Sequence, residues 1–193
     1  VGPSSPDKSL TDFVTSARSG KAPSIGTLGA GSASHLAAFA FGRATGINPT
    51  LVPYRSSSAV LEDLRAGHID AALLLPLMPK DALAAMQLRA LAVTSKAHSH
   101  LLPDVPRITE LTPFIFDLAS WIGIAAPAGT PKGVLDKMNI LFRWAAATPE
   151  VRKAMEASGV TAHSLDVDET NRLIAFDTVI WAEIAKEAGL KPQ

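Results

Sequence analysis

The first 94 residues alternate short apolar runs with amphipathic stretches, and this alternation limits the possible folds more than any other feature. The apolar runs predict strands over 23–28, 50–54, 69–75 and 88–94, and the amphipathic stretches predict helices over 9–19, 33–45, 56–67 and 79–86. The run at 69–75 is apolar throughout, which is typical of a strand buried on both faces. Strands and helices alternating at this spacing form right-handed βαβ units. The sequence therefore predicts an α/β fold with a parallel sheet flanked by helices.

The pattern changes after residue 95. Pro103, Pro106 and Pro113 interrupt residues 96–119, so we expect a loop-rich connection there. Beyond it the sequence predicts a strand, two helices, a second strand and a long helix, over 121–126, 131–147, 149–159, 160–165 and 168–188. A chain of 193 residues is long enough for one large domain or two small ones.

The composition excludes several classes of function. The 18 Lys and Arg residues balance the 18 Asp and Glu residues, so we expect no nucleic-acid partner, which would favour a basic surplus. The absence of Cys excludes thiolate catalysis, disulfides and cysteine-ligated zinc, and it fits a bacterial periplasm. No apolar run approaches the roughly 20 residues that a membrane-spanning helix needs.

The most informative segment is the turn Gly29-Ala-Gly-Ser-Ala-Ser-His35 between a predicted strand and a predicted helix. Glycines let the backbone approach a ligand closely, and the free N–H groups of a helix's first turn attract an anion. Ser32 and Ser34 add hydroxyl groups. A dinucleotide fingerprint would need a third glycine where Ser34 stands, and no phosphate-loop G-K-[ST] follows. The turn is either an anion-binding site or an ordinary connection with a serine N-cap.

Catalysis and metal binding find little support in the sequence. The hydrolase motif G-x-S-x-G is absent, and neighbouring side chains at a helix start point in different directions, which argues against a Ser34–His35 dyad. His98 and His100 have a metal-like spacing but no acidic cluster beside them, so we expect surface residues. We therefore expect no enzyme activity, cofactor or metal. One alternative is an α/β enzyme that acts on an acyl or phosphate group at the Gly29–His35 turn, and another is a stable proteolytic core that binds no ligand.

Seven segments together resemble one family. In their order and spacing they are similar to the Bug-type receptors of tripartite tricarboxylate transporters, which are periplasmic solute-binding proteins. The segments are GTLGAGSASHL (26–36), VPYR (52–55), AGHID (66–70), LRALAVTS (88–95), LPDVP (102–106), SWIG (120–123) and APAGTP (126–131).

The resemblance implies a fold of two α/β lobes with a ligand cleft between them. Residues 5–118 would form a complete second lobe, and 119–193 would supply the C-terminal part of the first lobe, whose N-terminal half-lobe has no match here. The implied function is capture of a small organic carboxylate for the membrane components of the transporter, in the periplasm. Helices 131–147 and 168–188 would then expose apolar faces, so we also expect self-association or exchange of the 120–193 segment.

The resemblance also implies the binding residues. The second lobe's carboxylate-binding loop corresponds to Gly31, Ser32, Ala33, Ser34 and His35, and further contacts correspond to Tyr54, Arg55 and Leu75.

Two departures from the family pattern bear on the ligand. Arg55-Ser-Ser replaces a usual Lys-Gly-Gly, and Leu74-Leu75 replaces a frequent Asp-Asn, so that Leu74, Leu75 and Pro76 would make one wall apolar. An unpaired charged group is costly against such a wall. We expect a solute with one carboxylate and an apolar or aromatic remainder, with Arg55 available as a counter-charge.

Overall fold

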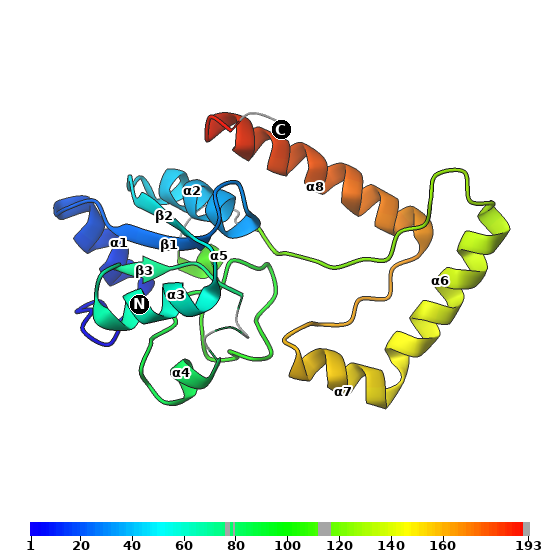
Figure 1. Ribbon diagram of the computed structural model, residues 1–193, viewed down its shortest axis with the longest axis horizontal. Helices are drawn as coiled ribbons and strands as arrows, with labels where there is room; N and C mark the ends of the chain where they lie inside the picture. The colour runs from blue at the N-terminus through cyan, green and yellow to red at the C-terminus, as the bar shows by residue number, and fades with distance from the viewer. Residues whose placement is uncertain (76–77, 79, 112–116, 191–193) are drawn as a thin grey trace. The chain divides into compact units, whose positions relative to one another are not determined.

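A computed structural model describes residues 1–75, 78, 80–111 and 117–190. The chain divides into two compact units (Figure 1). Unit 1 comprises Val1–Ser120 together with Ile184–Gln193, and unit 2 comprises Trp121–Glu183.

The centre of unit 1 is a parallel sheet of three strands, which confirms the predicted fold class. Strands β1 (Ser24–Leu28), β2 (Thr50–Tyr54) and β3 (Ala71–Ala72) are arranged in the order β2-β1-β3. Ile25 of β1 is aligned with Leu51 of β2 on one side and with Ala71 of β3 on the other. Strand β3 is shorter than the predicted 69–75, because its pairing with β1 ends soon after Gly26 is aligned with Ala72.

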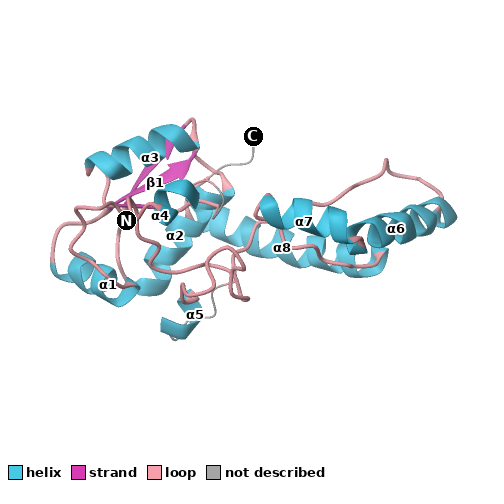
Figure 2. Ribbon diagram, turned by 90° about the horizontal axis from the view of Figure 1, so that it is seen from below, coloured by secondary structure: helices cyan, strands magenta, loops and turns pink. Residues whose placement is uncertain are grey.

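Helices cover both faces of this sheet (Figure 2). On one face, helices α1 (Leu10–Ser19) and α2 (Ala33–Thr45) enclose a cluster that contains Phe13, Ile25 and Phe41. On the other face, α3 (Ser57–Ala66) and α4 (Lys80–Ala84) contribute to a second cluster with Val60 and Leu64. The opposite placement of α2 and α3 follows from two right-handed crossovers that run in opposite directions from β1 to β2 and from β2 to β3.

The predicted strand at 88–94 is not a strand. Only a single bridge joins Val93 to Arg107, with the Val93 N–H donating to Pro106 O at 2.9 Å and the Ile108 N–H donating to Val93 O at 3.0 Å. Ile108 begins the short helix α5 (Ile108–Leu111), within the segment predicted as a loop. Pro79, at the start of the predicted helix 79–86, and Pro113 lie outside the described residues. An apolar run becomes a strand only where a second chain segment runs beside it for several residues.

Unit 2 is helical in the part of the chain that the structure describes. It contains α6 (Lys132–Ala147), α7 (Pro149–Ala157) and α8 (Val167–Glu187) up to Glu183. The predicted strands at 121–126 and 160–165 are wrong here, because neither pairs with a neighbouring strand among the described residues. Ile122 remains 88% exposed and Ile124 71% exposed.

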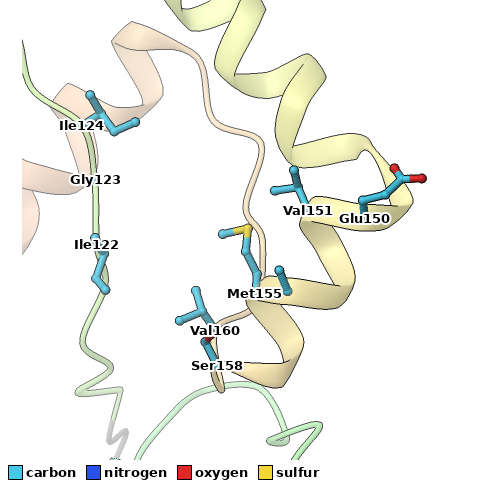
Figure 3. Close-up of a pocket in the computed structure, with 9 residues that line it drawn as sticks. Ile122, Gly123, Ile124, Glu150, Val151, Met155, Ser158 and Val160 are labelled. Carbon is cyan, nitrogen blue, oxygen red and sulfur yellow. The ribbon is translucent and has the colours of Figure 1, made fainter.

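A largely apolar cavity of about 570 Å³ lies within unit 2. Figure 3 shows the 122–124 segment on one side of it and α7 on the other. Its lining includes Ile122, Ile124, Val151, Met155 and Val160. Across the described ranges of both units, no helix is long and apolar enough to cross a membrane.

Candidate functional site

The glycine-rich turn lies at the carboxyl edge of the sheet, between the end of β1 and the start of α2. In the strand order β2-β1-β3, the connections from β1 to β2 and from β2 to β3 run in opposite directions, so the strand order reverses at β1. Ligands of open α/β sheets bind at the carboxyl ends of the strands where such a reversal occurs. Gly29 and Gly31 have φ values of +74° and +77°. These values suit glycine because other residues are strained there. The predicted turn and helix start are therefore confirmed.

Two serine hydroxyls organise the turn. Ser32 is the N-cap of α2, and its Oγ accepts a hydrogen bond of 3.2 Å from the His35 N–H. Ser34 Oγ accepts a 2.9 Å bond from the Leu28 N–H at the end of β1. The two Oγ atoms are 3.1 Å apart. One hydroxyl hydrogen is used between the two serines, so the other can be donated to a ligand.

The first turn of α2 also presents free backbone donors. Within the described ranges, the N–H groups of Ala33 and Ser34 donate to no acceptor, and intrahelical bonding begins with the Leu36 N–H, which donates to Ser32 O at 2.9 Å. The helix dipole places a partial positive charge at these groups. The turn can therefore hold an anion with two backbone amides and one hydroxyl.

The His35 side chain is directed to the sheet. Its Nδ1 lies 3.3 Å from Oγ1 of Thr27, a fully buried residue of β1. Burial lowers the pKa of His35 below its usual value, so the ring is neutral at pH 7. Of the described side chains, neither Ser32 nor Ser34 bonds to this ring. The arrangement lacks the nucleophile–base hydrogen bond of a serine hydrolase.

Tyr54 contributes to the turn through its backbone. Its carbonyl oxygen accepts a 2.9 Å hydrogen bond from the Gly29 N–H. Its phenol donates to Oδ2 of Asp63 at 2.6 Å, and Oδ1 of Asp63 lies 3.1 Å from Nδ1 of His68. Burial, and then the bond to Asp63, raise the pKa of Tyr54 to about 12. The phenol is therefore hydrogen-bonded to a residue of α3.

Arg55 and Leu75 are exposed at the same edge of the sheet. Arg55, directly after β2, forms no hydrogen bond or ion pair with any described residue. Leu75 is 50% exposed, whereas Leu74 is partly buried and packs against the cluster that contains Val60. Pro76, the third residue of the predicted apolar wall, lies outside the described residues.

One residue near the turn was missed by sequence reasoning. A Cβ placed on Gly31 would lie 3.6 Å from Cδ1 of Leu190, which follows the end of α8. The sequence did contain a pattern that could have identified it, because Gly189-Leu190 directly follows a predicted helix. A glycine followed by an apolar residue often ends a helix, and the apolar side chain then packs back against the last turn.

The predicted surface histidines do not form a metal site in the described part of the chain, where no three potential ligands cluster. His98 instead lies 2.9 Å from Glu110.

Comparison with known proteins identifies the family. Residues 1–190 match the family model described as "Tripartite tricarboxylate transporter family receptor". A protein in the tcbD-tcbE intergenic region of Pseudomonas sp. (strain P51) is 29% identical over 185 residues, which are 95% of this chain and 55% of that protein. BugT from Bordetella pertussis is 30% identical over 161 residues, which are 83% of this chain and 49% of BugT.

The solved structure of an R. palustris protein with adipate is 29% identical and superposes with a TM-score of 0.81. The match covers 100% of this chain and 65% of that chain. This chain therefore spans about half the length of the two curated relatives and about two thirds of the solved one.

The family is one of periplasmic transport receptors, so the predicted location and binding class are confirmed at the level of the family. The resemblance predicted from the seven segments is also confirmed, and the chain belongs to the tripartite tricarboxylate transporter receptor family.

Proposed function

We propose that this chain takes part in the extracytoplasmic capture of a small organic carboxylate for a tripartite tricarboxylate-type transporter. The observation that carries the proposal is the pair of free amides at Ala33 and Ser34, beside a serine hydroxyl and at the positive end of α2. One carboxylate would bind to the segment Gly31, Ser32, Ala33, Ser34 and His35. The adipate of the R. palustris relative supports a carboxylate as the ligand class.

The two predicted lobes, 5–118 and 119–193, are part of this proposal. A division of the chain between Ser120 and Trp121 supports the boundary, although Ile184–Gln193 groups with the first unit. In this assignment the turn belongs to the complete lobe. The membrane components of the transporter are the partners that the family implies.

The edge around the turn favours a ligand with one carboxylate and an apolar remainder. Leu75 offers exposed apolar surface, and a charged group buried against it would lose hydration without gaining a partner. Arg55 is the exception, because its guanidinium is exposed and unpaired among the described residues and can approach a second carboxylate. Tyr54 would support the turn through its carbonyl group.

We expect weak binding by this chain. Charge near a helix N-terminus is worth about 0.3–1 kcal/mol, and up to ~2 kcal/mol when the site is partly buried. For a site of one hydroxyl and two amides we expect an affinity in the millimolar range, which corresponds to about −4 kcal/mol.

Amide NMR suits this affinity. The ¹⁵N-labelled 193-residue chain is titrated with benzoate, adipate, citrate and aspartate, with sodium chloride at matched ionic strength as the blank. We expect saturable shifts of the Ala33 and Ser34 amides with benzoate, whose remainder is apolar, and with adipate, whose second carboxylate Arg55 can approach. Ser32→Ala should weaken binding, whereas Ser19→Ala should not, since among the described residues the Ser19 hydroxyl bonds only to carbonyls of its own helix.

The absence of saturable shifts at the turn with every carboxylate would refute the function. A preference for citrate or aspartate would agree with carboxylate binding, but it would contradict the expectation that the rest of the ligand is apolar. The enzyme alternative would require turnover of an ester, amide or phosphate that Ser32→Ala or His35→Ala abolishes.

A further inference from the structure

The C-terminal end of α8 forms a defined helix stop. The Gly189 N–H donates to Lys186 O at 3.1 Å, and the Leu190 N–H donates to Ala185 O at 2.9 Å. Gly189 has a φ of +72°. This hydrogen-bond pattern is the Schellman motif, in which the residue after the glycine is turned back onto the helix. The motif fixes the direction of Leu190 by local sequence alone.

One ion pair links this helix end to α2, and one side chain approaches the turn before α2, all within unit 1. Cδ1 of Leu190 lies 3.6 Å from the position of a Cβ on Gly31. Glu187, at the last position of α8, pairs with Arg43 of α2 at 3.1 Å. Both side chains of this ion pair are largely exposed, so its energy is small, and it shows only that the helix end lies close to α2.

We propose that Leu190 is a positioning residue of the carboxylate-binding turn, an inference that rests on the proposed function. Glycine has more backbone freedom than other residues, and a glycine-containing turn that the ligand must order binds more weakly. Cδ1 of Leu190 lies beside Gly31, where it would restrict the backbone of the turn before the ligand arrives. The end of α8 therefore sets the affinity of the site without touching the ligand.

The experiment compares the full chain with Leu190→Ala, Leu190→Met and Val160→Ala. Val160 is the matched control because it follows the glycine that ends α7 in the same way, with its N–H donating to Met155 O at 2.9 Å. Val160 belongs to unit 2, whereas the turn belongs to unit 1. Two quantities are measured for each variant by NMR: the ¹⁵N relaxation of Gly31 to Ser34 without ligand, and the dissociation constant for adipate.

We expect Leu190→Ala to increase fast backbone motion at Gly31 and to weaken adipate binding by about three- to tenfold. Leu190→Met should restore both values, and Val160→Ala should change neither. Unchanged motion in Leu190→Ala, or an equal change in Val160→Ala, would overturn the inference. If the unaltered chain binds no carboxylate, the proposed function fails, and the relaxation data alone then decide whether Leu190 orders the turn.

Discussion

The backbone N–H of Leu28 donates a 2.9 Å hydrogen bond to Oγ of Ser34, so the end of β1 is tied to the first turn of α2. This bond crosses the glycine-rich turn from one regular element to the next. The Ser34 hydroxyl thus gives the Leu28 N–H an acceptor in place of a sheet hydrogen bond.

Ser34→Ala should therefore destabilise the protein. The substitution leaves the half-buried Leu28 N–H without its acceptor, which costs about 1 kcal/mol of unfolding free energy. Urea denaturation measures the loss. The matched control is Ser58→Ala, because Ser58 has the same contact with a serine two residues earlier, at 3.0 Å, but is exposed and accepts no backbone N–H among the described residues. Equal losses in the two variants would contradict this role of Ser34.

The titration of Tyr54 tests the contact with Asp63 directly, because the chain has one tyrosine. Absorbance of the phenolate should show a pKa of about 12 in the folded protein and about 10 in urea. The folded value is raised by burial and by the hydrogen bond to Asp63. Asp63→Asn should lower it, and His68→Gln, which leaves the Tyr54–Asp63 bond in place, should change it far less. A pKa near 10 in the folded protein would show that the phenol is free.

His35 should make stability depend on pH in a specific window. Burial lowers its pKa in the folded state, so between that value and the usual value of about 6.5 the unfolded chain binds more protons. The contribution of His35 to the free energy of unfolding is then fully present above pH 6.5. It decreases as the pH falls through 6.5 toward the folded pKa. His35→Gln should remove this part of the pH dependence, while His163→Gln, whose side chain is exposed, should keep it. Urea midpoints from pH 7.5 to 5 measure both variants.

Self-association should follow from the exposed apolar side chains of unit 2. On α6, Trp144 is 70% exposed and Ile140 is 65% exposed, and on α8 Phe176 is similarly exposed. Apolar patches larger than a few hundred Å² seldom persist on monomers. We expect light scattering to show a mass that increases with concentration, and Ile140→Glu to reduce it. A single monomer mass, together with resistance of the 120–193 segment to proteases, would contradict this expectation.

Helix positions and the candidate turn could be predicted from the sequence because their signals are local. Ser9 and Asp12 form the reciprocal cap of α1, and Ser32 caps α2 within four residues of chain. Gly29 and Gly31 mark the positive φ values of the turn. Each of these features depends on hydrogen bonds or torsion angles between residues that are near neighbours in sequence.

Tertiary structure decided which strands pair and which partners the side chains have. The apolar runs at 88–94, 121–126 and 160–165 have strand-like composition, but a strand needs a distant segment alongside it, and the described residues supply none beyond the bridge at Val93. The folded structure also decides the hydrogen-bond partner of the Tyr54 phenol, which donates to Asp63 of α3. Leu190 reaches Gly31 across 159 positions of sequence. Local sequence thus determined where the longer helices and the turn lie, while contacts between distant segments decided which runs pair and which side chains surround the turn.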